Sequence, residues 1–181
     1  MSTIIRTMSW GLALMLVLGL AGCAGKQQIA AGPILPSNPA DPFKVSLTTP
    51  QPQPLVEGEG MQFVLLSALD GYAHLYNLRQ SGDVQVLAEN LPLAARVPRS
   101  YPSIQDGFEL RAQAPAGRDQ IVLVVTRSPF NAGVLPPGRR PPAATVQTPE
   151  QVATRLRSIL ERQPVDGWSR DILAVDVLVR R

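Results

Sequence analysis

The residues of this 181-residue chain that could do chemistry are few, and they centre on its only histidine, His74. Tyr72, His74 and Tyr76 alternate along one apolar stretch, so in an extended strand they would share one face. Such an aromatic stripe is most often an ordinary strand surface. The alternative interpretation is that His74 is catalytic, because an imidazole paired with a carboxylate can act as a general base. We therefore take the three side chains as a candidate binding surface.

Other patterns that would indicate catalysis or metal binding are absent from the sequence. A single histidine excludes a metal site built on two, and no GxSxG, HExxH or phosphate-cradling glycine loop occurs. Glu57 and Glu59 lie on one predicted turn, without the opposed placement across a sugar ring that glycoside hydrolysis needs. We expect no metal, no cofactor and no enzymatic activity.

The only cysteine, Cys23, follows a short apolar segment. That segment runs from Trp10 to Ala21, after a polar start that carries one positive charge, Arg6. Twelve residues rise about 18 Å as a helix, whereas the hydrocarbon core of a bilayer is about 30 Å thick. The layout therefore predicts an export signal over residues 1–22 and not a permanent membrane span.

The four residues that end this segment, Leu20-Ala21-Gly22-Cys23, resemble the lipobox of bacterial lipoproteins. The resemblance implies that Cys23 carries lipid and becomes the first residue of the mature chain, so that the membrane is one partner. Ala24 follows the cysteine, where enteric-type sorting reads Asp as an inner-membrane signal. Residence in the outer membrane, facing the periplasm, is the expected location.

Two segments of the chain are rich in proline. Residues 23–43 contain four prolines among small and polar residues, which predicts a partly extended tether. A second proline-rich segment, residues 131–147, holds Arg139 and Arg140, which we add to the candidate binding surface. Without the leader, basic residues exceed acidic ones by only two, too small an excess to indicate a nucleic-acid partner.

Between and after these segments, residues 44–181 read as one β-rich domain. Apolar runs of strand length occupy residues 44–48, 61–67, 71–78, 83–89, 108–113, 120–126 and 172–179. Asp70-Gly71 and Ser81-Gly82-Asp83 between such runs are hairpin signals, and residues 115–117 form a further turn. The pattern predicts a small antiparallel β-sandwich of about six to eight strands.

One helix is predicted over about residues 149–162. Thr148 can cap it, and Gln151 completes a capping box. Arg155 and Arg157 fall mostly on a second, exposed face. The apolar stripe recurs at helical spacing and should pack on the sheet: Val152, Leu156, Ile159 and Leu160.

Several of these features together resemble a bacterial family, domain of unknown function 4384, over roughly residues 57–130. They include Asp70-Gly71-Tyr72 opening a strand, Glu89-Asn90, and the turn Pro115-Ala116-Gly117. The resemblance implies a small β-sandwich in exported or surface-facing proteins, without established catalytic residues. It supplies no site to transfer to this chain.

Two functions stay open on the sequence alone. The first is a non-catalytic envelope lipoprotein whose β domain binds another protein or a cell-wall component, as an accessory of a secretion or envelope complex. The second is a cell-wall-acting envelope enzyme that uses His74 with a carboxylate.

Overall fold

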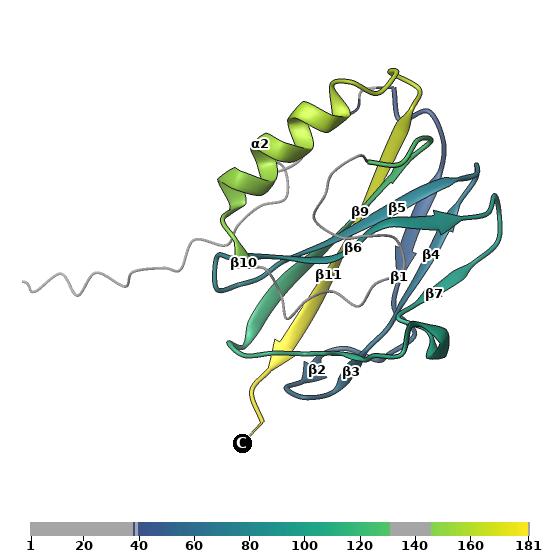
Figure 1. The fold of residues 1–181 in the computed structure, drawn as a ribbon. Coiled ribbons are helices and arrows are strands. Elements are labelled where there is room, and N and C mark those ends of the chain that lie inside the picture. Colours follow the sequence, from purple (N-terminus) through teal and green to yellow (C-terminus); the bar gives the residue numbers. More distant parts are fainter. Residues whose placement is uncertain (1–37, 39, 131–145, 181) are drawn as a thin grey trace, which may run out of the picture.

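Two β-sheets face each other, and one α-helix lies on the outer side of the larger sheet (Figure 1). The computed structural model describes residues 38, 40–130 and 146–180. The larger sheet has the order β10 (Val146–Gln147), β6 (Val84–Leu93), β5 (Gly71–Leu78), β9 (Gly117–Thr126), β11 (Trp168–Leu178) and β2 (Leu55–Val56). Its neighbouring strands are antiparallel except β11 and β2, which are parallel.

The smaller sheet has the order β1 (Val45–Thr48), β4 (Phe63–Ser67) and β7 (Arg99–Tyr101). A two-stranded ribbon of β3 (Gly60–Met61) and β8 (Leu110–Arg111) stands beside it, with a 3-10 turn, η1 (Ile104–Asp106), between β7 and β8. The predicted fold class is confirmed, because the described chain is mainly β with one packed helix, α2 (Pro149–Leu160).

The main core fills the space between the two sheets. The sequence of β9 is apolar without alternation because residues 121–126 are all buried, on both faces of the sheet. Ile121, Leu123 and Val125 belong to the core between the sheets, whereas Val122 and Val124 belong to a second core on the opposite face. The smaller sheet contributes Leu47, Phe63 and Leu65 to the main core.

Helix α2 covers the second core. The predicted capping box is confirmed: Thr148 Oγ1 accepts from the N–H of Gln151 at 3.3 Å, and Gln151 Oε1 accepts from the N–H of Thr148 at 3.0 Å. The buried face of the helix consists of Val152, Leu156 and Leu160. It packs against sheet residues that include Tyr76, Val84, Val122, Val124 and Trp168. The packing role predicted for this helix is therefore confirmed.

We expect Leu156→Ala to lower the free energy of unfolding by about 2–5 kcal/mol, because Leu156 is 1% exposed and its removal leaves a cavity beneath the helix. Arg157→Ala, on the exposed side of the same helix, should change it by less than about 0.5 kcal/mol. Urea denaturation of the two variants measures both values. Equal losses would mean that the helix does not pack as described.

One of the two predicted hairpins does not form, and a further predicted turn also connects different sheets. Asp70-Gly71 joins β4 to β5, which lie in different sheets, and residues 115–117 join β8 to β9, which also lie in different sheets. The glycine at position 71 serves close packing, since a Cβ there would lie 2.5 Å from the carbonyl oxygen of Thr126 on β9. The turn at residues 79–83 does connect the antiparallel pair β5 and β6, as predicted.

The strands that the sequence did not indicate are short. β2 and β10 have two residues each and β7 has three, too few for a periodic pattern to show. The expected strand over residues 108–113 is reduced to the two residues of β8. The last two residues of the proline-rich segment 131–147 form β10, and they pair with Val84 and Gln85 of β6.

The folded domain begins before residue 44. Phe43 is 6% exposed and belongs to the main core, although the predicted tether includes it. The side-chain amide of Asn38 donates to the carbonyl oxygens of Val165 at 3.2 Å and Trp168 at 2.6 Å. The predicted signal peptide, Cys23 and most of the tether lie outside the described residues. No helix within the described ranges has the length and apolar character needed to cross a membrane.

Candidate functional site

The predicted aromatic surface lies along β5, on the face of the sheet that carries the second core. Tyr72 is half-buried, but His74 and Tyr76 are 0% and 1% exposed. The expectation that these three side chains form a contact surface is therefore wrong for His74 and Tyr76. The reason is that α2 and Phe130 add a layer over this face, which the strand pattern alone does not reveal. Arg139 and Arg140 lie outside the described residues.

His74 has both ring nitrogens engaged. Its Nδ1 accepts from the backbone N–H of Asn90 at 3.3 Å, so the ring proton belongs on Nε2. That nitrogen lies 3.0 Å from Thr126 Oγ1, whose hydroxyl in turn donates to the carbonyl oxygen of Ser128 at 2.7 Å. The ring also stacks on Phe130, with centroids 3.5 Å apart and planes 15° from parallel. The imidazole is held as a neutral packing element.

The electrostatic surroundings of His74 also oppose protonation. Burial, reinforced by the positive charge of Arg155, lowers the pKa of His74 from its ordinary value of 6.5 to about 3. A general base needs a free lone pair and a pKa near the working pH. In this structure the ring has neither feature.

A second buried polar cluster joins the helix to the sheet. The hydroxyl of Tyr76 donates to Glu89 Oε1 at 2.9 Å, and Arg155 Nη2 lies 2.7 Å from Glu89 Oε2. The Glu89 side chain is 0% exposed and that of Arg155 is 21% exposed. The prediction that Arg155 lies on the exposed face of α2 is therefore wrong, because a long arginine can reach from the helix flank to a carboxylate in the sheet. Burial, followed by the Glu89 charge, raises the pKa of Tyr76.

An irregularity in β6 places these polar groups. Ala73 of β5 pairs with Leu91 and Leu75 pairs with Ala88, so Glu89 and Asn90 together stand opposite the single residue His74. This is a β-bulge, and Asn90 takes its left-handed conformation with φ 54°. The Asn90 side chain donates to the carbonyl oxygen of Phe130 at 2.8 Å and accepts from its N–H at 2.6 Å. A Glu-Asn pair inside a β run is the sequence signal for such a bulge, since asparagine is depleted in strands.

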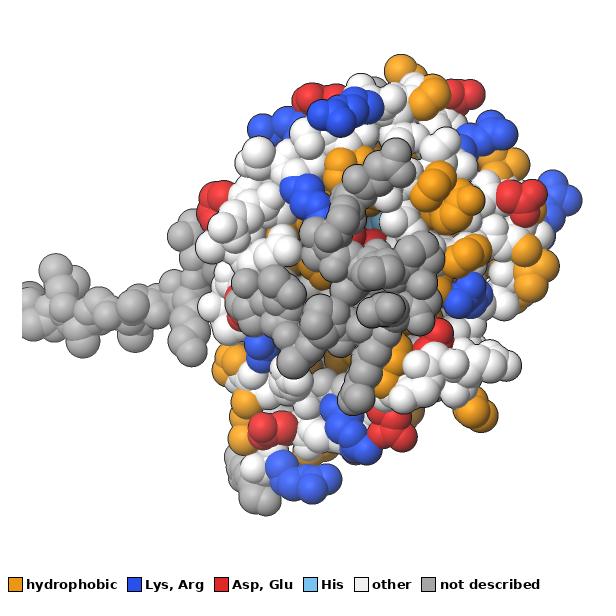
Figure 2. Space-filling view, in the orientation of Figure 1, with side chains coloured by type: hydrophobic (Ala, Val, Ile, Leu, Met, Phe, Trp, Pro, Cys, Tyr) orange, Lys and Arg blue, Asp and Glu red, His pale blue; other side chains and the backbone are white. Residues whose placement is uncertain are grey.

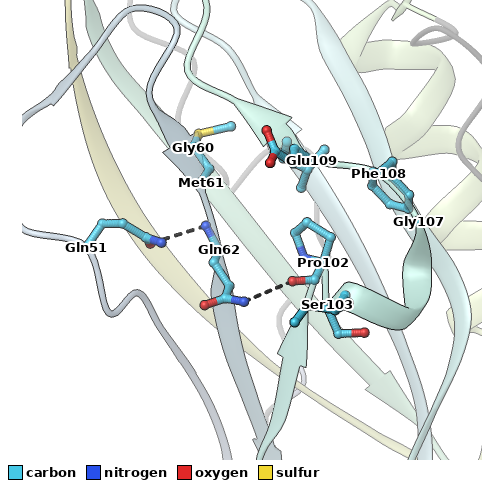
Figure 3. A pocket seen from close by; sticks show the side chains of 11 residues that line it. Gln51, Gly60, Met61, Gln62, Pro102, Ser103, Gly107, Phe108 and Glu109 are labelled. Carbon is cyan, nitrogen blue, oxygen red and sulfur yellow. Dashed lines mark hydrogen bonds between the residues drawn. The ribbon is translucent and has the colours of Figure 1, made fainter.

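An open groove lies at the other end of the domain, where β3, β8 and η1 meet (Figure 3). Its volume is about 530 Å³. Apolar and polar side chains share the lining, which includes Gln51, Met61, Gln62, Ile104, Phe108, Glu109 and Leu110. Sequence reasoning missed this site, because its residues come from four short segments that no common motif marks.

Hydrogen bonds fix the walls of this groove. The side-chain amide of Gln62 donates to the carbonyl oxygen of Pro102 at 3.1 Å, and the N–H of Gln62 donates to Gln51 Oε1 at 3.2 Å (Figure 3). Asp106 Oδ2 accepts from the N–H of Ser103 at 2.6 Å and closes the η1 turn. The side chain of Ile104, on that turn, is 100% exposed. A fixed turn therefore holds a large apolar side chain in water at the groove.

Charge on the visible surface is mixed. Figure 2 shows basic and acidic side chains interspersed over the described part of this face, without a continuous basic patch. In the described part of the chain, no three side chains of His, Cys, Asp or Glu come close enough to hold a metal ion.

Comparison with known proteins gives one match. Residues 55–129 match the family model described as domain of unknown function DUF4384. The resemblance expected over residues 57–130 is therefore confirmed. No curated protein and no solved structure matches the chain significantly. The matched residues begin at β2 and end just after β9. They include both buried polar clusters, apart from Arg155 and Phe130. They also include all of the groove lining except Gln51.

Proposed function

We propose that this chain is an exported, lipid-anchored protein of the bacterial envelope. Its β domain would be a non-catalytic assembly module that binds another envelope protein through the groove beside η1. The observation that carries the binding proposal is the complete exposure of Ile104 at that groove. Burying a side chain of this size against a partner is worth about 1.5–3 kcal/mol. Half-buried Phe108 and Leu110 share the groove lining with Ile104 and extend the apolar contact that a partner could make.

The polar groups of the groove favour binding over chemistry. Its acidic side chain, Glu109, forms an ion pair with Arg111, and the Ser103 hydroxyl donates to Asp106 at 2.7 Å. The groove lining contains neither histidine nor cysteine. His74, which the enzymatic alternative needs as its base, is enclosed in the second core. These arrangements support a module that positions a partner.

The anchor part of the proposal rests on the segment Leu20-Ala21-Gly22-Cys23. We expect Cys23→Ser to abolish incorporation of labelled fatty acid, because serine lacks the thiol that would carry the lipid. The native chain should be recovered with the outer membrane after density-gradient separation, since Ala24 follows the cysteine. Labelling of the serine variant, or recovery of the native chain in the inner membrane, would contradict this part.

A photocrosslinking amino acid at position 104 should capture one discrete partner in intact cells, because Ile104 projects fully into solvent at the groove. The matched control is position 165, where Val165 is also apolar and 70% exposed but lies in the turn after α2. The adduct should form from position 104 and not from position 165. Equal capture from both positions would indicate non-specific contact, and an adduct with cell-wall glycan would redirect the proposal to a cell-wall ligand.

A further inference from the structure

A second groove is lined by residues of the paired strands β1 and β4 and by two cationic side chains. It has a volume of about 480 Å³. The lining consists of Lys44, Val45, Ser46, Leu66, Ser67, Ala68 and Arg96. Ser46 and Leu66 pair in register and are half-buried, so they form a floor on the outer face of the smaller sheet. The cations come from two segments, the start of β1 and the loop after β6.

Both cations are exposed, and among the described residues neither has an acidic partner. Asp70, in the loop between β4 and β5, accepts the N–H of Ala95 at 2.7 Å through its carboxylate. Two apolar side chains are exposed in neighbouring loops: Leu69, 37% exposed, between β4 and β5, and Val97, 55% exposed, after β6. The groove thus combines two available positive charges with apolar surroundings.

The backbone holds Arg96 in a fixed and uncommon conformation. Its φ is 60°, a left-handed value that a residue with a side chain seldom adopts. The N–H of Arg96 donates to the carbonyl oxygen of Ser67 at 2.7 Å, and the bond from Ala95 to Asp70 secures the preceding residue. The N–H of Ala68 likewise donates to the carbonyl oxygen of Lys44 at 2.9 Å. Both cations are therefore tied by their backbones to the same end of β4.

The groove also lies near the point where the chain enters the domain. Asn38 is the first described residue, and Lys44 follows six residues later. Fifteen residues separate Asn38 from Cys23, so the chain between them spans at most about 54 Å. A lipid on Cys23 would keep this end of the domain within that distance of the bilayer.

We infer that this groove binds the headgroup of an anionic phospholipid, and that it seats the domain on the membrane that carries its anchor. Lys44 and Arg96, which both line the groove, would contact the lipid phosphate. The half-buried side chain of Leu66 would face the less polar glycerol region. The inference rests on the proposed anchor for the location of the membrane and on the groove itself for the choice of lipid.

The test uses the full chain reconstituted in nanodiscs of phosphatidylcholine, with or without phosphatidylglycerol. Amide hydrogen exchange of residues 44–48, 66–69 and 94–98 should be slowed by phosphatidylglycerol. Each basic side chain near an acidic bilayer contributes about fivefold to the binding equilibrium. The double variant Lys44→Gln/Arg96→Gln should therefore lose about thirtyfold and show no lipid-dependent slowing. The control is the double variant Arg157→Gln/Arg162→Gln, in which one exposed position lies in α2 and the other just after it. This variant should keep the lipid-dependent slowing of exchange.

Equal exchange in the two kinds of disc, or slowing that survives the Lys44→Gln/Arg96→Gln change, would overturn the inference. Inorganic phosphate added to phosphatidylcholine discs should have no effect, and slowing by phosphate alone would identify a free-anion site instead. Whether the chain stays bound to discs of both compositions tests the proposed lipid anchor on Cys23 separately from the groove. If the chain dissociates from the discs, the same comparison is made with added vesicles of the two lipid compositions. Slower exchange with phosphatidylglycerol vesicles would support the inference, and equal exchange would overturn it.

Discussion

Replacing Arg155 by alanine should lower the free energy of unfolding by about 3–5 kcal/mol, which is a large part of the stability of an ordinary domain. The substitution removes the cationic partner of Glu89, whose side chain is fully buried. Only the hydroxyl of Tyr76 would then remain to stabilise the carboxylate. A buried charge without its partner retains its desolvation cost, and this cost is the source of the expected loss.

Two comparisons separate the ion pair from general effects on the helix. Arg157→Ala removes the same side chain type from an exposed position of α2 and should change stability by less than about 0.5 kcal/mol. Combining Arg155→Met with Glu89→Gln removes both charges and should recover part of the loss. Urea denaturation measures all the variants. The buried ion pair would be disproved as a source of stability if Arg155→Ala and Arg157→Ala unfolded at the same midpoint.

The stability of the domain should depend on pH through His74. Its folded-state pKa, about 3, lies below its ordinary value of 6.5, so the unfolded chain takes up the proton first as the pH falls. The contribution is complete above about pH 6.5 and is lost progressively between pH 6.5 and pH 3. Between pH 7.5 and pH 5 the expected loss is about 2 kcal/mol, at 1.36 kcal/mol for each pH unit below 6.5.

The clean control is His74→Asn, because the chain has no other histidine. Asparagine can keep an acceptor for the N–H of Asn90, but it does not titrate. The variant should be less stable at every pH, and the pH dependence attributable to His74 should disappear. Burial raises the pKa of Asp119, an effect of opposite sign, yet it is present in both proteins and cancels in the comparison. An unchanged difference between pH 5 and pH 7.5 in the variant would show that His74 is not buried in neutral form.

The elements with strong local signals were predictable from the sequence. Thr148 and Gln151 specify the start of α2, and its apolar stripe identifies the face that packs. The last apolar run, residues 172–179, lies largely in β11 and contributes Val175 and Val177 to the core. These features depend on neighbouring residues, which a single sequence displays directly.

The arrangement of the sites depends on contacts between distant residues, and the sequence pattern does not reveal it. His74 stacks on Phe130, which is 56 positions away in the sequence. Glu89 pairs with Arg155, which is 66 positions away. The aromatic alternation of β5 was visible, but the layer of α2 and Phe130 over it was not. Ile104 lies in a three-residue turn, so no periodic pattern marks its exposure.

We propose that the domain acts by binding through the groove beside η1 and not by chemistry at His74. The most direct measurement compares Ile104→Glu with His74→Asn for the yield of the partner adduct in chemically crosslinked cells at pH 7.5. Ile104→Glu should abolish the adduct while stability stays within about 0.5 kcal/mol, because the residue is fully exposed. His74→Asn should keep the adduct as long as the domain is folded. Loss of the adduct in a folded His74→Asn protein, with full retention in Ile104→Glu, would contradict the account.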